Sequence, residues 1–375
     1  MAQIVLIASF LVPLILSGVI LYGARGNSPK IILSLSLLNA AAVFIANYYY
    51  FIGNFEVYTY LHSTHVALVL FIYPSIYLYL VCLIRKIELT GKILFHLAPG
   101  VLFLLLYLFF FDLKFAFAER VDFLTTYRDE LFAKEAFKHV EWIRIVNVAV
   151  IVLQVVVYSI AIFIESHRYN FRLKTEFSNA ESLQIKWLPW FNVALIIVAV
   201  ISVLFYATNP FSEENNKLLI ISMFIMSVFI WLFGIWGNAQ KAIEFPVEEI
   251  ATTDVENIED ILYKKLLTVL LEDKLYLNPN LTLTELALAA GTNRSYASQA
   301  INKTYHDNFN TLVNSYRVET AKNILKEAPD LKLETVAEQS GFGSAQSMHR
   351  NFSKQTGISP GKVKQTFRKH KDVKA

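Results

Sequence analysis

Apolar residues dominate the first 240 positions of the chain and come in long runs separated by short polar breaks. The seven runs are Gln3–Tyr22, Ile31–Ile52, Leu61–Ile84, Ile93–Phe111, Ile145–Ile164, Leu188–Ala207 and Leu218–Gly237. None of them contains Asp, Glu, Lys or Arg, and each is about 20 residues long, enough for a helix to cross a hydrocarbon core of ~30 Å. The runs do not alternate apolar with polar residues, as barrel strands do. The pattern predicts a bundle of seven membrane-spanning helices over residues 1–237.

The loops between these runs differ in charge. Alternate loops hold the basic residues Arg25, Lys30, Arg85, Lys86, Lys92, Arg168, Arg172, Lys174 and Lys186, whereas Glu56, Glu213 and Glu214 lie in the intervening loops. Because short basic loops stay in the cytoplasm, we expect the N-terminus outside a bacterial inner membrane and the C-terminus inside. No basic residue precedes the first run, unlike in a cleaved signal peptide, so we expect that run to remain as a span.

After Gly237 the chain turns polar, which predicts a juxtamembrane linker at 238–260 and a separate domain at 261–375. That domain repeats one pattern, helix–glycine–helix, at about 284–304 and about 333–356. Thr284 and Ser344 are expected N-caps. Gly291 is expected to take the positive φ at the end of the first helix, and Gly341-Phe342-Gly343 is the expected turn of the second unit. A longer helix over 311–326 is expected to join the two units. The predicted fold class is therefore all-α, a seven-helix membrane bundle followed by a cytoplasmic double helix-turn-helix domain.

The second helix of each repeated unit carries polar side chains at positions that face outward. In a helix-turn-helix this helix enters the major groove of duplex DNA, where base edges differ. The candidate DNA-contacting residues are Arg294, Ser295, Ser298, Gln299, Asn302 and Lys303 in the first unit, and Ser344, Gln346, Ser347, His349, Arg350 and Lys354 in the second.

Composition agrees with this division. Hydrophobic residues make up 55% of the chain and charged residues only 17%, against about 25% in soluble domains, which excludes a single water-soluble domain. The net charge of +3 lies in the last 125 residues, because residues 1–250 hold 17 basic and 17 acidic groups. Residues 341–375 carry eight basic groups against Asp372 alone, which suits contact with phosphates.

The C-terminal domain resembles the DNA-binding domain of the AraC family of bacterial transcription factors over about 276–368. The most specific stretches are "LTLTELALAAGTNRSYASQAIN", "FNTLVNSYRVETAKNIL" and "VAEQSGFGSAQSMHRNFSKQTGISP". The resemblance implies that base contacts fall on Ser295, Ser298, Gln299, Asn302, Gln346, Ser347 and Arg350. The whole chain looks like membrane-bound regulators of this family in which seven spans replace a soluble sensor.

Polar residues inside the spans are candidates for ligand contact. They are Asn47, His62, His65, Asn147, Gln154 and Asn192. Hydrogen bonding between neighbouring helices is the alternative role for such residues. His62 and His65 share a helix face, but no further ligands point to a metal site. The spans contain no acidic residue and no lysine, so we expect neither an enzyme nor a cofactor.

These observations lead to one hypothesis and one alternative. The hypothesis is a membrane-bound one-component transcription regulator whose spans detect a small molecule or lipid signal and whose partner is double-stranded DNA. We expect a homodimer, because two tethered DNA-binding domains gain affinity through effective concentration. The alternative is a small-molecule transporter or channel with a regulatory C-terminal domain.

Overall fold

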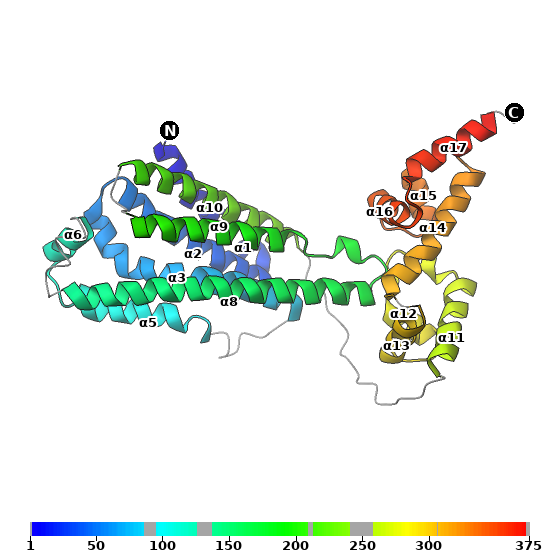
Figure 1. Ribbon diagram of the computed structural model, residues 1–375, viewed down its shortest axis with the longest axis horizontal. Helices are drawn as coiled ribbons and strands as arrows, with labels where there is room; N and C mark the ends of the chain where they lie inside the picture. The colour runs from blue at the N-terminus through cyan, green and yellow to red at the C-terminus, as the bar shows by residue number, and fades with distance from the viewer. Residues whose placement is uncertain are drawn as a thin grey trace. The chain divides into compact units, whose positions relative to one another are not determined.

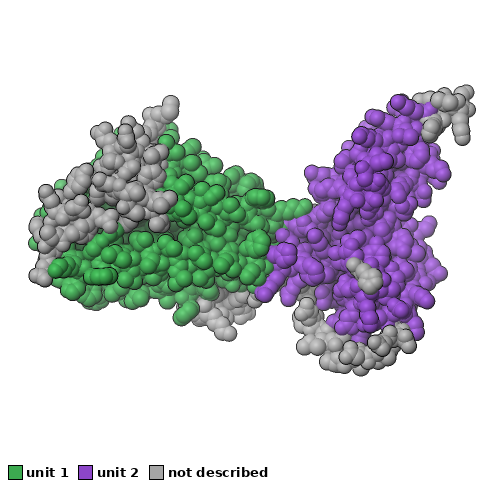
Figure 2. All heavy atoms as spheres, in the orientation of Figure 1, with its two compact units in different colours: residues 1–166, 185–244 green, residues 167–184, 245–375 purple. Residues whose placement is uncertain are grey.

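A computed structural model describes residues 2–85, 95–125, 137–208, 213–240, 258–305 and 307–372. The chain forms two compact units (Figures 1 and 2). The first unit comprises residues 1–166 and 185–244, and the second comprises 167–184 and 245–375. Both are helical throughout the described residues, apart from an isolated bridge between Phe177 and Thr282. Most of the predicted linker, residues 241–257, lies outside the described part of the chain.

The helices of the first unit follow the seven apolar runs. They are α1 (Ala2–Ala24), α2 (Ser28–Phe51), α3 (Phe55–Arg85), α5 (Ala98–Tyr107) with a π-turn at Leu108–Asp112, α6 (Phe117–Thr125), α8 (Lys138–Glu176), α9 (Trp187–Thr208) and α10 (Glu213–Ala239). The last ten residues of α8 belong to the second unit.

Within the described residues, five helices are long and apolar enough to cross a membrane: α1, α2, α3, α8 and α10. A sixth arises if the pair Ala98–Asp112 and Phe117–Thr125, bent by 110°, counts as one span. α9 contains a shorter apolar helical stretch, Trp187–Ile201. The expected seven spans therefore stay a prediction.

Small polar side chains join the helices of the first unit. The Ser17 hydroxyl on α1 donates to the Ser34 carbonyl on α2 at 2.9 Å, and the Ser34 hydroxyl donates back to the Ser17 carbonyl at 2.9 Å. The Tyr79 hydroxyl on α3 donates to the Gly237 carbonyl on α10 at 2.8 Å. Where water is excluded, such bonds hold helices together because no competing partner is available.

The second unit contains the expected pair of helix-turn-helix repeats. Its helices are α11 (Ile258–Glu272), α12 (Leu283–Ala289), α13 (Arg294–Tyr305), α14 (Phe309–Glu327), α15 (Leu333–Gln339), α16 (Ala345–Thr356) and α17 (Pro360–Asp372). Gly291 takes φ of 64°, as expected, and in the turn of the second repeat it is Gly341 that takes a positive φ, of 83°. A Cβ on Gly341 would also lie 2.6 Å from the Tyr276 carbonyl oxygen, so only glycine fits there.

α14 connects two hydrophobic cores. Its first half contributes Phe309, Leu312 and Val313 to the core of the first repeat. Its second half contributes Val318, Ala321 and Leu325 to the core of the second repeat. Since one continuous helix of 19 residues, about 28 Å long, is buried in both cores, the two repeats are held as one body.

The helix caps differ from expectation in one place. Ser344 caps α16, as predicted. At the start of α13, Oδ1 of Asn293 accepts from the Tyr296 amide at 3.0 Å. Thr284 was predicted to cap the first helix of the first repeat, and this was wrong. The cap is Thr282, which forms a reciprocal capping box with Glu285, so the helix begins two residues earlier.

We expect Thr282→Ala to destabilise α12 by about 1 kcal/mol, because the amide of Glu285 loses its acceptor. Hydrogen exchange of the intact protein should then speed up roughly fivefold in α12, since exchange there reports local opening. Thr282→Ser keeps the hydroxyl and is the control. Equal exchange rates in the two variants would show that the box contributes nothing.

Candidate functional site

The second helix of the first repeat, α13, presents part of the predicted DNA-contacting set to solvent. Gln299, Asn302 and Lys303 are exposed, whereas Ser295 and Ser298 are half-buried. Ala300 and Ile301 face the core. The polar stripe that the sequence predicted therefore exists on this helix. Arg294 begins the helix and is only 17% exposed, because it forms an ion pair with Glu176.

The corresponding helix of the second repeat, α16, is arranged in the same way. Ser344, Gln346, His349, Arg350 and Lys354 are exposed, while Met348 and Phe352 are buried in the core. Ser347 was expected on the outer face but is only 5% exposed. It lies in the first turn of the helix, where its amide donates to Oγ of Ser344 at 3.1 Å. It does not belong to the accessible surface.

Residues 167–184 pack against both of these helices within the second unit. Besides the pair of Glu176 with Arg294, the Glu181 carboxylate accepts from Nε of Arg350 at 2.8 Å and from Nδ2 of Asn351 at 3.3 Å. Two acidic side chains of this segment thus reach both helices. Glu176 binds Arg294 at the start of α13, and Glu181 binds Arg350 and Asn351 on α16. The sequence assigned this segment to a cytoplasmic loop and not to the DNA-binding domain.

A fully buried arginine anchors the same segment. Arg317 on α14 uses all five of its N–H donors. They go to the carbonyls of Tyr276 (2.7 Å), Asn278 (2.7 Å) and Ser178 (3.2 Å), to Oγ of Ser178 (2.9 Å) and to Oδ1 of Asn314 (3.2 Å). Burial lowers the pKa of Arg317 to about 9, so the guanidinium stays protonated at neutral pH.

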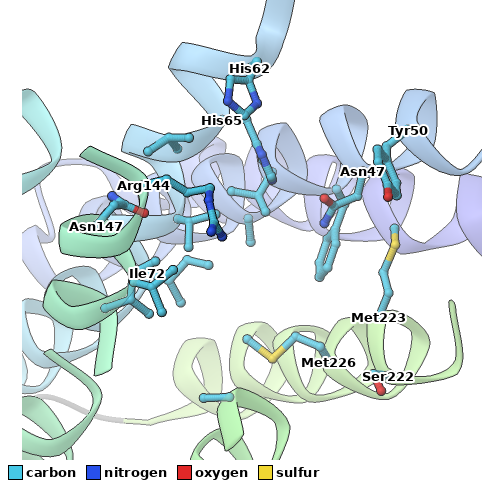
Figure 3. Close-up of a pocket in the computed structure, with 18 of the residues that line it drawn as sticks. Asn47, Tyr50, His62, His65, Ile72, Arg144, Asn147, Ser222, Met223 and Met226 are labelled. Carbon is cyan, nitrogen blue, oxygen red and sulfur yellow. The ribbon is translucent and has the colours of Figure 1, made fainter. Parts of the chain in front are cut away.

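The first unit contains a cavity of about 500 Å³ (Figure 3). Its wall is mostly apolar and comes from α2, α3, α8, α9 and α10, with contributions from the α5–α6 region. Five of the six predicted ligand-contacting residues line it: Asn47, His62, His65, Asn147 and Gln154. Residues far apart in sequence are therefore gathered around one space.

Several polar atoms in the cavity wall have no hydrogen-bond partner among the described residues. They are Nε2 of His65, the hydroxyl of Tyr73 and Nδ2 of Asn147. A buried polar atom without a partner is costly, so a ligand that bonds these atoms would be favoured. Asn192 does not line the cavity, and its Nδ2 donates to the Ser159 carbonyl at 3.1 Å. This is the hydrogen bond between helices that was the alternative to ligand contact.

One polar feature of the cavity was not predicted. Arg144 and Glu141, one turn apart on α8, line the wall and form an ion pair, with Nε of Arg144 2.6 Å from Oε2 of Glu141. The predicted fifth span begins one residue later, at Ile145. The sequence signal for this ion pair was a glutamate and an arginine three residues apart, just before an apolar run.

Elsewhere in the described residues, no group of three or more His, Cys, Asp and Glu side chains converges. The structure thus offers no metal centre within those ranges. The candidate sites are the polar faces of α13 and α16 and the cavity of the first unit.

Comparison with known proteins addresses the second unit. A family model described as "Helix-turn-helix domain" matches residues 286–366. Residues of this chain are 35% identical, over 88 positions, to a Bacillus subtilis (strain 168) protein named "Uncharacterized HTH-type transcriptional regulator YtdP". The alignment covers 24% of this chain and 11% of that protein. No solved structure matches.

The matched residues run from α12 to α17 and include both repeats. In this region the comparisons agree with the caps, turns and hydrophobic cores of the structure. The chain contains a helix-turn-helix domain of the AraC type at residues 286–366, which supports a DNA-binding transcription regulator.

Proposed function

We propose that this chain is a membrane-bound, one-component transcription regulator. In this proposal α13 and α16 read duplex DNA in the cytoplasm, and the cavity of the first unit receives the controlling signal. The observation that carries the proposal is the presence, on one chain, of two capped recognition helices and of helices apolar enough to cross a membrane.

The outer surface of the first unit supports the membrane location. Large apolar side chains such as Ile4, Phe163 and Ile197 are exposed on α1, α8 and α9. Water-soluble proteins rarely expose contiguous apolar surface of this kind, whereas lipid tails cover it without cost. The expected orientation still follows from the basic loops alone.

The geometry of the second unit supports sequence-specific reading. Gln299 and Gln346 are exposed on α13 and α16, and amide side chains recognise adenine through paired hydrogen bonds. Because α14 holds both repeats as one body, we propose that the two helices enter consecutive major grooves. The basic residues of α17, including Lys362 and Lys369, would contact phosphates and add affinity without specificity.

The composition of the cavity indicates the class of signal. Its wall is largely apolar, and its unpartnered atoms belong to neutral side chains. The cationic Arg144 is already neutralised by Glu141. We therefore propose a small, mainly apolar molecule with one or two hydrogen-bonding groups as the ligand.

Sequence-specific DNA binding is tested on the intact protein in lipid nanodiscs. Duplexes are selected from genomic fragments, and affinity is measured at several salt concentrations. We expect Gln299→Ala to weaken binding to the selected sequence by about 1–3 kcal/mol and to leave binding to random DNA unchanged.

The matched control for this experiment is Gln339→Ala, the same exchange at an exposed position near the end of α15. It should bind like the parent protein, because α15 is the first helix of its repeat and does not enter the groove. Failure of the parent protein to select any sequence would overturn the proposed function.

The signal site is tested by filling the cavity. Ala199 lines the cavity on α9, so Ala199→Phe should exclude a bound molecule. Native mass spectrometry of protein extracted in mild detergent should show a small molecule on the parent protein and at least a tenfold lower occupancy on the variant. Val156→Phe, on an exposed position of α8, should retain it. Equal occupancy in both variants would place the ligand elsewhere.

A further inference from the structure

One segment that lies between two helices of the first unit in the sequence folds with the DNA-binding domain. Residues 167–184 follow the predicted fifth span and precede the sixth, yet they belong to the second unit. Their backbone is held at several points. The Ser178 amide donates to the Leu281 carbonyl at 3.1 Å, and Phe177 forms a bridge with Thr282.

Side chains of α14 hold this backbone from the other side. Asn310 donates to the Ser178 carbonyl at 2.8 Å and to the Phe177 carbonyl at 3.1 Å. Asn314 donates to the Ser178 carbonyl at 3.2 Å, and Arg317 bonds both oxygens of Ser178. A buried guanidinium needs an acceptor for each of its N–H donors. Without Ser178, two donors of Arg317 would have no acceptor.

The acidic side chains of the segment bind cationic groups that DNA would require. Glu176 is 1% exposed and pairs with Arg294, the first residue of α13. Glu181 pairs with Arg350 on α16. A carboxylate presents two acceptor oxygens to a guanidinium much as a phosphate or a guanine edge does. Each carboxylate neutralises the charge of its arginine and takes donors from one edge of the guanidinium, so an arginine that is paired with the segment offers less to DNA.

The segment also approaches the turn of the second repeat. A Cβ placed on Gly343 would clash with Nδ2 of Asn179 and would lie 3.2 Å from its Cγ. The side chain of Asn179 thus lies against the residue directly before the α16 cap. In a helix-turn-helix the start of the second helix is the part that contacts base edges. The segment consequently lies beside the reading end of α16, where Ser344 and Gln346 stay exposed.

We propose that residues 167–184 are an internal inhibitor of DNA binding, in which Glu176 and Glu181 occupy Arg294 and Arg350 in place of DNA. This inference rests on the proposed function, because it names how the same DNA-binding surface is regulated. Release of the segment frees both arginines from their carboxylates and removes Asn179 from beside the start of α16.

The connections of the segment indicate what releases it. α8 leads into it and α9 follows it, and both helices line the cavity through residues such as Asn147 and Val198. A ligand that shifts either helix acts on the ends of the segment through the covalent chain. The ion pair of Glu181 with Arg350 is partly exposed and weak by itself, so the signal must chiefly break the hydrogen bonds of Ser178 and the buried pair of Glu176 with Arg294.

A reversible cross-link tests the proposal on the intact chain. Cys82 is the single cysteine of the sequence and is buried, so an added pair oxidises without competition. Asn179→Cys with Gly343→Cys places two thiols in disulfide range, because Cγ of Asn179 lies 3.2 Å from the position that a Cβ of residue 343 would take. We expect the oxidised protein to bind selected duplex DNA at least tenfold more weakly than the same protein after reduction.

The single variants Asn179→Cys and Gly343→Cys are the controls and should not respond to reductant. If the disulfide does not form, or if the oxidised and reduced proteins bind DNA equally, the inhibitory role is overturned. If the reduced protein and the parent both fail to select any DNA, the proposed function fails, which is a separate outcome.

Charge neutralisation gives a second test that needs no cross-link. Glu176→Gln with Glu181→Gln should raise the affinity of the intact protein for selected DNA roughly tenfold, since two arginines lose their internal partners. Glu272→Gln with Glu327→Gln removes the same charge from exposed positions of α11 and α14 and is the matched control. An equal rise in both double variants would contradict the proposal, because general electrostatics would then explain it.

Discussion

The buried guanidinium of Arg317 holds the second unit together. A charge taken out of water is tolerated only when every donor has a partner, and here five bonds reach three separate parts of the chain. Tyr276 and Asn278 belong to the turn before the first repeat, Asn314 to α14, and Ser178 to the segment after α8. Removal of any one of these acceptors leaves a buried donor unsatisfied, so the position of each part depends on the others.

This constraint explains why a loop between two predicted spans belongs to the DNA-binding domain. Ser178 supplies two of the five acceptors, although it lies 139 residues before Arg317 in the sequence. The bond brings Glu176 and Glu181 to α13 and α16. The hydrogen bonds of Ser178 therefore serve both structure and regulation. They satisfy the buried guanidinium of Arg317, and they hold in place the carboxylates that compete with DNA.

The sequence predicted the elements whose signals are local. Gly291, Gly341 and the Ser344 cap identified both repeats because a positive φ or a capping hydroxyl is required at each of these places. Thr284 was chosen over Thr282 because both lie near the helix start, and only the reciprocal bond of Glu285 distinguishes them. The buried position of Ser347 was missed for a similar reason, since outward periodicity is least defined in the first turn of a helix.

The candidate sites were predictable to different extents. Asn47, His62, His65, Asn147 and Gln154 were found because a polar group in an apolar helix avoids lipid and so faces other helices. Nothing in the sequence separates them from Asn192, whose role follows from a carbonyl on a neighbouring helix. The docking of residues 167–184 was not predictable, because its main partners are backbone carbonyls and a buried arginine, and such contacts leave no pattern along the chain.

In the proposed mechanism, DNA and residues 167–184 compete for Arg294 and Arg350. Hydrogen exchange at the Ser178 amide, which is bonded to the Leu281 carbonyl, measures this directly in the intact protein. Addition of selected duplex DNA should speed exchange across 173–184 while it slows exchange in α13 and α16. Slower or unchanged exchange in the segment on DNA binding would contradict the account, because the segment would then remain docked while DNA is bound.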